Sequence, residues 1–173
     1  IANYKITPDM MIYASWSKGV NPSQFNTNIL AQPAAVQVAA AASGVTLAVD
    51  PEKITNYELG LKGTAMNGAL RYALAAYYAQ WTNQINSVTI LVPNPANPTV
   101  PDLVGGVQNS GRVNLKGIEL ELAYRVSDLV TFDVAGAIND SDIREFKSPP
   151  LSRLTGIYDY RGKEMPYSSK YSF

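Results

Sequence analysis

Long segments in which apolar and polar residues alternate are the feature that most constrains this fold. From Asn56 to Lys62, large apolar side chains occupy odd positions and polar ones occupy even positions. Because successive side chains of a β-strand point to opposite faces, this period of two predicts a strand with one apolar and one polar face. The same reasoning predicts five complete strands, over Met10 to Lys18, Ile54 to Thr64, Ala69 to about Val88, Arg112 to Val126 and Leu129 to about Asp142, and two partial strands, one of them Tyr167 to Phe173.

The connections between these strands are of two alternating kinds. Tight turns are expected at Thr7 to Asp9, at Ala65 to Gly68, where Asn67-Gly68 favours positive φ, and at Ser127-Asp128. The other connections are long: Gly19 to Lys53, Thr89 to Gly111 and Ile143 to Pro166. Loops of roughly twenty residues are uncommon in compact soluble domains. One rim of short turns and one rim of long loops is typical of an outer-membrane β-barrel.

The predicted fold is therefore all-β: an antiparallel up-and-down transmembrane β-barrel. Hydrocarbon offers the backbone no hydrogen-bond partners, so a sheet that crosses a bilayer must close on itself. Five complete and two partial strands fall short of the roughly eight strands of the smallest membrane barrels, so the chain is expected to be part of a larger barrel. The sequence begins at Ile1 and stops within a predicted strand, which also suggests a piece of a longer polypeptide. It contains no apolar run of about 18 residues that would form a transmembrane helix.

Composition narrows the function. The chain has no histidine and no cysteine, which argues against His-based nucleophilic catalysis, thiol chemistry, disulfides and zinc sites with these ligands. Fourteen basic and fourteen acidic residues cancel, whereas a nucleic-acid partner would favour a basic excess. We therefore predict no catalytic residue, no resident metal, no cofactor and no nucleic-acid partner.

Several segments, in order along the chain, resemble the TonB-dependent outer-membrane receptors. Tyr13 to Gly19 (YASWSKG), followed by Gln24 to Asn26, is similar to a strand and loop of that family. Pro51 to Lys62 (PEKITNYELGLK) is the most specific match, and further matches are Tyr77-Tyr78 with Trp81 and Gln84-Ile85, Asn109 to Gly111 with Lys116 to Glu121, and Met165-Pro166 with Lys170-Tyr171. The resemblance implies a barrel of about 22 strands with a plugged lumen.

The resemblance also implies a function and partners. The expected function is binding and energised import of a scarce solute across the outer membrane of a Gram-negative bacterium, with a ferric siderophore as the expected cargo. Expected partners are outer-membrane lipid, the receptor's own plug domain and, through the plug, the TonB complex. The plug and the C-terminal strands lie outside residues 1–173, so this piece alone is not expected to transport. Alternatives are a passive porin or adhesin barrel, or a secreted β-sandwich binding module that would remain soluble and monomeric.

Candidate cargo contacts lie on the long loops, because binding residues gather on loops held by a rigid scaffold. They are Gln24, Phe25, Asn26, Arg153, Tyr158, Tyr160 and Arg161. An anionic ferric chelate would suit the two arginines. The segment Gln32 to Val49, rich in alanine and valine, is predicted to be either a short helix beginning near Pro33 or a mobile loop.

A second set of polar residues is expected to face the lumen or the plug: Asn56, Glu58, Lys62, Glu119, Glu121 and Arg125. Glu119 and Glu121 resemble a catalytic carboxylate pair in type but not in arrangement, because such a pair must flank a bond from opposing sides. Asn139 to Asp142 offers oxygen ligands for calcium, but the spacing does not match an EF-hand loop, and an ordinary strand end is favoured.

The aromatic residues Trp16, Tyr57, Trp81 and Tyr124 fit interfacial girdles or ordinary packing, and a bulge is expected near Tyr77.

Overall fold

The computed structural model describes residues 1–94, 96–97, 99–146, 152, 155–157 and 159–173. Its main element is a seven-stranded antiparallel sheet with the order β1-β2-β5-β6-β7-β8-β9. The strands are β1 (Ala2–Thr7), β2 (Met10–Asn21), β5 (Glu52–Ala65), β6 (Leu70–Val92), β7 (Asp102–Arg125), β8 (Thr131–Phe146) and β9 (Tyr171–Ser172). Between β2 and β5 lie β3 (Gln24–Phe25), α1 (Thr27–Leu30), α2 (Ala34–Ala42) and β4 (Ala48–Val49), and β3 pairs with β4.

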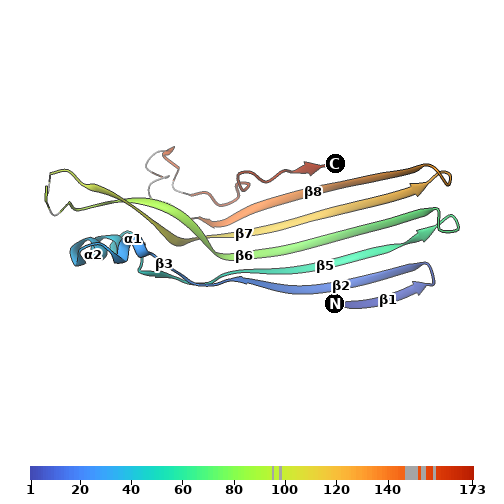
Figure 1. Cartoon of the computed structure of the whole chain (residues 1–173), viewed down its shortest axis with the longest axis horizontal. Helices are drawn as coiled ribbons and strands as arrows, with labels where there is room; N and C mark the ends of the chain where they lie inside the picture. Colours follow the sequence, from blue (N-terminus) through green and yellow to red (C-terminus); the bar gives the residue numbers. More distant parts are fainter. Residues whose placement is uncertain (95, 98, 147–151, 153–154, 158) are drawn as a thin grey trace.

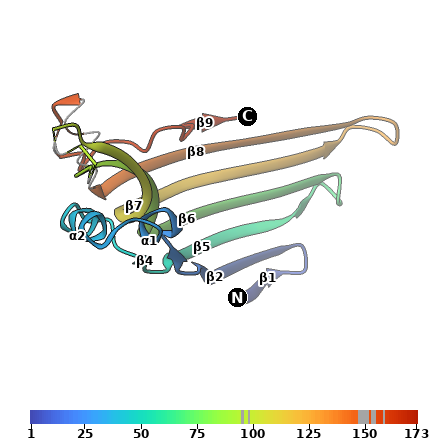
Figure 2. The same ribbon diagram turned by 60° about the vertical axis from the view of Figure 1, so that its left-hand side comes forward.

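This sheet confirms the predicted up-and-down architecture. Each large strand pairs with its neighbour in sequence, and the three tight turns lie together at one end while the helices and the long connections lie at the other (Figure 1). The sheet is curved and open, with β1 and β9 at its edges (Figure 2). The β-sandwich alternative is wrong, because in the described part of the chain the seven strands form one layer without a second large sheet packed on it. Neither described helix has the length and apolarity needed to cross a membrane.

The turn between β5 and β6 forms where the sequence predicts it. Met66 and Asn67 both have φ of 52°, and Gly68 has φ of 84°. The Gly68 N–H donates to the Ala65 carbonyl at 3.1 Å, which closes the turn. Positive φ values match the right-handed twist of the two flanking strands, and asparagine and glycine accept them at low cost.

The strands β6 and β7 are longer than predicted. Most of the expected loop Thr89 to Gly111 is a β-hairpin that extends beyond the rest of the sheet, with Val88 paired to Gly106 and Ile90 to Val104 (Figure 1). Alternate residues of this hairpin, Val88, Ile90 and Val92, lie in one hydrophobic cluster with residues of the two helices, and this packing favours strands where a loop was expected. The bulge lies between Trp81 and Gln84, where Asn83 has φ of 54°, and not near Tyr77 as expected.

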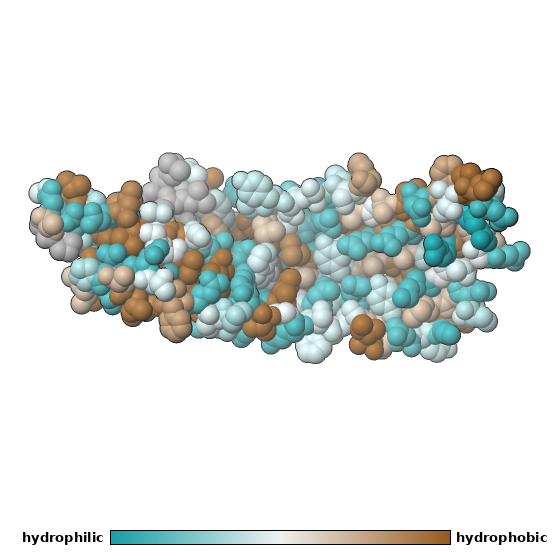
Figure 3. All heavy atoms as spheres, in the orientation of Figure 1, coloured by the Kyte–Doolittle hydropathy of each residue, from teal (hydrophilic) through white to brown (hydrophobic). Residues whose placement is uncertain are grey.

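A small hydrophobic core joins the first long connection to this hairpin. The cluster consists of Ile29, Val36, Ala40, Val45, Val88, Ile90 and Val92, and Val104 packs against it. Its first four members belong to the connection and its last three to the hairpin. The helical alternative for Gln32 to Val49 is correct over α2, with Pro33 directly before the first helical residue. We call residues 24–49 together with the described residues between positions 84 and 109 the loop platform. Hydrophobic residues gather at this end of the molecule in Figure 3.

The rest of the sheet has one apolar and one polar face, and both are set by the strand register. Directly paired residues of antiparallel strands lie on the same face. One cross-strand row therefore contains Ala14, Leu59, Ala76, Ile118 and Ile138, and the next contains Ile12, Leu61, Leu74 and Leu120. Leu59 is 61% exposed and Val134 is 59% exposed, so the described chain leaves this apolar face uncovered.

Candidate functional site

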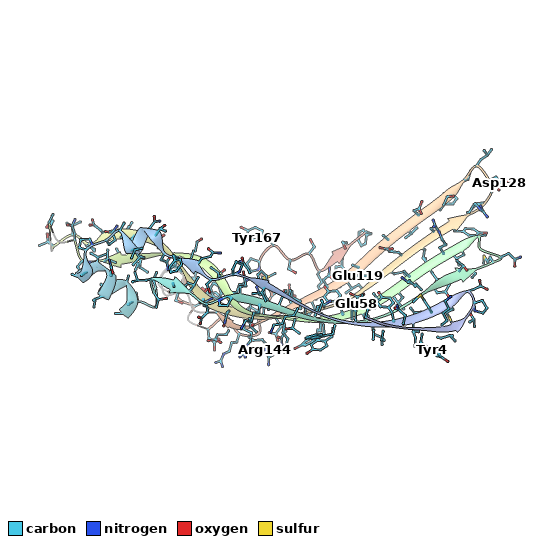
Figure 4. All side chains as sticks on the ribbon, turned by 60° about the horizontal axis from the view of Figure 1, so that its bottom comes forward. Tyr4, Glu58, Glu119, Asp128, Arg144 and Tyr167 are labelled. Atoms are coloured by element: carbon cyan, nitrogen blue, oxygen red, sulfur yellow. The ribbon has the colours of Figure 1, made fainter. Side chains whose placement is uncertain are left out.

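The six residues expected to face a lumen lie on one face of the sheet. Lys62 pairs with Ala73, which pairs with Glu121, and Glu58 pairs with Tyr77, which pairs with Gly117. Asn56 shares the face of Glu58, and Glu119 and Arg125 share the face of Glu121, because their positions differ by two or four along a strand. Figure 4 shows Glu58 and Glu119 on the concave side of the sheet and Tyr4 on the other side. Figure 3, which views the concave side, shows mostly hydrophilic residues along the sheet.

Hydrogen bonds across strands order the middle of this polar face. The Tyr13 hydroxyl donates to Glu58 Oε1 at 2.7 Å, and the Tyr77 hydroxyl donates to Asn139 Oδ1 at 2.8 Å. Glu119 has only small partners, since it pairs with Ala75 on one side and Ala137 on the other. Glu119 and Glu121 therefore project side by side from one strand, and they do not face each other across a gap as a pair of glycosidase carboxylates must.

The polar face is hollowed near the tight turns. A cavity of about 760 Å³ opens there, and its lining extends from β1 and β2 across β5 and β6 to β7 and β8. Its charged lining is mixed and consists of Lys5, Asp9, Lys62, Arg71, Glu121 and Asp133. Because both signs of charge lie in one concavity, this surface is better suited to contact a polar protein surface than to bind a small ligand of a single charge.

The candidate calcium residues do not converge. They lie on one strand, so Asn139 and Ser141 point to the polar face while Asp140 and Asp142 point to the opposite face. Asp140 forms an ion pair with Lys116 at 3.1 Å, and Asp142 forms one with Arg144 at 2.8 Å. The arrangement is that of a strand end with local charge pairing.

Aromatic residues border the apolar face at two levels. Trp16, Tyr57 and Tyr78 form one directly paired row, and Tyr124 and Phe132 pair at the other end, beside Leu70. The path along β6 from Leu70 to Tyr78 is about 27 Å at roughly 3.4 Å per residue, comparable with an apolar band of about 25 Å between two aromatic girdles. Trp81 does not belong to either row, because it pairs with Val113 on the opposite face.

Asn26, one of the predicted cargo contacts, is buried and fully engaged. Only 4% of its surface is exposed. Its Nδ2 donates to the Thr46 carbonyl at 2.6 Å and to the Val107 carbonyl at 2.8 Å, and its Oδ1 accepts the Val107 N–H at 2.7 Å. The side chain thus pairs with one residue of β7 as a neighbouring strand would, and it fixes the first long connection to the hairpin.

A second asparagine, Asn109 of the Asn109 to Gly111 segment, has the same role. Asn109 Oδ1 accepts the Asp50 N–H at 2.7 Å, and its Nδ2 donates to the Asp50 carbonyl at 3.0 Å and to the Asn83 carbonyl at 2.8 Å. Asn26 and Asn109 therefore fasten the two ends of the connection between β2 and β5 to the β6–β7 hairpin. No local pattern marks either role, because each side chain bonds to backbone far away in the sequence.

The other contacts predicted on the first connection, Gln24 and Phe25, are exposed. They border a groove of about 440 Å³ between residues 24–28 and the hairpin. The hairpin side of the groove is formed by Ser87, Val88, Thr89, Gly105, Gly106 and Val107. The structure thus places Gln24 and Phe25, but not the amide of Asn26, where a ligand could meet free side chains.

The third long connection holds the remaining candidates. Arg153 and Tyr158 lie outside the described residues. The Tyr160 ring packs edge-on against Phe146 with centroids 5.4 Å apart. Arg161 is bound to Asp159, whose Oδ1 accepts the Arg161 N–H at 3.0 Å and whose Oδ2 accepts from Nε at 2.9 Å. These hydrogen bonds lower the pKa of Asp159 to about 2.

Comparison with known proteins agrees with this geometry. A family model described as TonB dependent receptor-like, β-barrel, matches residues 2–173. The chain is also 28% identical over 123 residues to the ferric-pyoverdine 358 receptor of Pseudomonas putida. This alignment covers 71% of this chain and 12% of that receptor.

Solved structures show the same fold. The ferric yersiniabactin uptake receptor FyuA from Yersinia pestis matches 98% of this chain and 20% of its own length, with a TM-score of 0.61 and 20% identity. The pyoverdine outer membrane receptor FpvA from Pseudomonas aeruginosa PAO1 also matches 98% of this chain and 20% of its own length, with a TM-score of 0.52 and 20% identity. The chain thus spans a fifth or less of the length of these relatives.

Proposed function

From the premise that this chain belongs to the TonB dependent receptor-like β-barrel family, we propose that it forms part of the wall and outer loops of a receptor that imports a ferric siderophore. Membership of the family places the chain in the outer membrane of a Gram-negative bacterium. Two of the similar proteins are named for ferric pyoverdine and ferric yersiniabactin, which supports an iron chelate as cargo.

The observation that carries this proposal is the division of the sheet into two faces beneath one rim of large loops. The exposed apolar face, bordered by Tyr78 at one level and Tyr124 at the other, would contact outer-membrane lipid. The polar face would line the lumen and contact the plug domain, with Asn56, Glu58, Lys62, Glu119, Glu121 and Arg125 as the contacting residues. Through that plug the receptor would engage the TonB complex.

In this proposal no residue of the chain is catalytic and no cofactor is resident. Glu119 and Glu121 serve as polar wall residues, and iron enters only as part of the cargo. The loop platform would form part of the outer binding surface, together with Tyr160, Arg161, Arg153 and Tyr158 of the third connection. Asn26 and Asn109 would hold that surface in place and would not contact cargo.

Uptake measurements test the proposal against a passive porin. The full-length gene that contains this segment would be expressed in cells that lack their own siderophore receptors, with and without a functional TonB complex. We expect accumulation of radioactive iron from a ferric siderophore only when both the gene and the TonB complex are present. Equal uptake without the TonB complex would contradict energised import and favour the passive barrel, and no uptake from any ferric chelate would contradict the choice of cargo.

A further inference from the structure

The loop platform contains no positive charge. Residues 21–51 and 82–111, which include the whole platform, contain two charged residues, Asp50 and Asp102, and neither lysine nor arginine. Neither acid borders the groove of about 440 Å³ between residues 24–28 and the hairpin. An anionic ligand in this groove would find no cation to offset the loss of its hydration, and that loss is costly.

The groove does offer uncharged hydrogen-bonding groups. Five exposed polar side chains border it, and none of them hydrogen-bonds within the described chain: Gln24, Thr27, Asn28, Ser87 and Thr89. Beside them lies the ring of Phe25, which is 72% exposed. A small number of polar groups around an apolar surface is the usual composition of a site that fixes the orientation of a small molecule.

The walls of the groove are fixed and its floor is open. Two hydrogen bonds tie the Asn26 side chain in one wall to the Val107 backbone in the other. A Cβ atom at Gly106 would lie 3.2 Å from Asn26 Oδ1, so the two walls are in close contact at this point. A Cβ atom at the adjacent Gly105 would meet no other atom within 4 Å. Rigid walls reduce the entropy lost when a ligand binds.

We propose that this groove binds an uncharged part of the cargo that is rich in amide, hydroxamate or hydroxyl groups, so that the platform favours a chelate without net negative charge. The inference rests on the proposed function and adds the chemical class of the cargo. It departs from the expectation that Arg153 and Arg161 select an anionic chelate. Arg161 is already bound to Asp159 by several hydrogen bonds, so the described part of the third connection does not present it as a free cation.

The test uses the full-length receptor in outer membranes and two probes, an uncharged ferric trihydroxamate and a strongly anionic ferric tris-catecholate. Gly105→Trp should place a large ring in the groove, since a Cβ atom at this position has open space around it, and should weaken binding of the trihydroxamate by about tenfold or more. Gly105→Ala is the matched control and should change binding by less than about twofold. Thr89→Lys should weaken binding of the trihydroxamate and strengthen that of the tris-catecholate.

The outcomes separate this inference from the proposed function. Tighter binding of the trihydroxamate, lost in Gly105→Trp and kept in Gly105→Ala, supports the inference. Import of the anionic chelate alone, or trihydroxamate binding that Gly105→Trp leaves unchanged, would overturn the inference while the proposed function stands. Heat-modifiable mobility of each variant in gels verifies that the barrel is folded in every comparison.

Discussion

The ring of Tyr13 on β2 lies across Gly60, the residue with which Tyr13 directly pairs on β5. The hydroxyl of the same tyrosine donates to Glu58, two residues before that glycine. A second pair repeats the arrangement, because a side chain at Gly117 would lie 2.6 Å from the ring of its partner Tyr77. Both pairs lie on the polar face, where each ring occupies the space above a glycine and covers its backbone.

Gly60→Ala should therefore destabilise the barrel wall. The added methyl group would occupy the position of the Tyr13 ring, and overpacking of this kind costs about 1–3 kcal/mol. Thermal unfolding of the full-length receptor in detergent, followed by heat-modifiable mobility, measures the loss. In the Tyr13→Ala background the same glycine substitution should cost much less, and an equal cost in both backgrounds would contradict the contact.

Asn26→Ala should loosen the loop platform without weakening the sheet. The substitution leaves the Val107 N–H and two backbone carbonyls without their partner, and each unsatisfied buried group costs about 1–3 kcal/mol. Hydrogen exchange should become faster in residues 24–49 and 104–109, while the thermal stability of the barrel stays unchanged. Asn28→Ala, at an exposed neighbouring position, is the control and should leave exchange unaltered.

Local periodicity was sufficient to predict most of the strands and the tight turns, although the strand expected from Tyr167 to Phe173 is confined to Tyr171–Ser172. The alternation from Asn56 to Lys62 predicts which residues share a face, and Asn67-Gly68 predicts the turn, because both depend only on neighbours in the chain. The continuation of β6 beyond Val88 could not be predicted in this way. Its proline- and glycine-rich surroundings are typical of a loop, and packing of Ile90 and Val92 on the helices overrides that local preference.

The packing of the loop platform was harder to predict because its contacts are distant in sequence. Asn26 pairs with Val107, 81 positions away, so nothing near residue 26 distinguishes a buried clamp from an exposed ligand contact. The face of Trp81 was missed for a simpler reason. It lies three positions after Tyr78, so the two rings point to opposite faces and only one of them belongs to the aromatic row.

The third connection should respond to acid through Asp159. Side-chain hydrogen bonds from Arg161, followed by the backbone bond from the same residue, lower the pKa of Asp159 from 3.8 to about 2. A folded-state pKa below the ordinary value means that the interaction is fully present above about pH 4 and is lost as the pH falls toward about 2. Carboxyl-carbon NMR of the labelled receptor should show the low midpoint, and Arg161→Gln should return it toward 3.8. Equal midpoints in the two proteins would contradict the pairing.

Two adjacent alanines of β6 test which face of the sheet contacts lipid. Ala76 lies on the apolar face between Leu59 and Ile118, whereas Ala75 lies on the polar face beside Glu119. Ala76→Arg should destabilise the membrane-inserted receptor by about 1–3 kcal/mol, because a charge facing hydrocarbon is costly in a depth-dependent way. Ala75→Arg is the matched control and should cost little, since its guanidinium can reach the Glu119 carboxylate. Denaturant titration of the receptor in lipid vesicles measures both, and a larger loss for Ala75→Arg would reverse the assignment of the two faces.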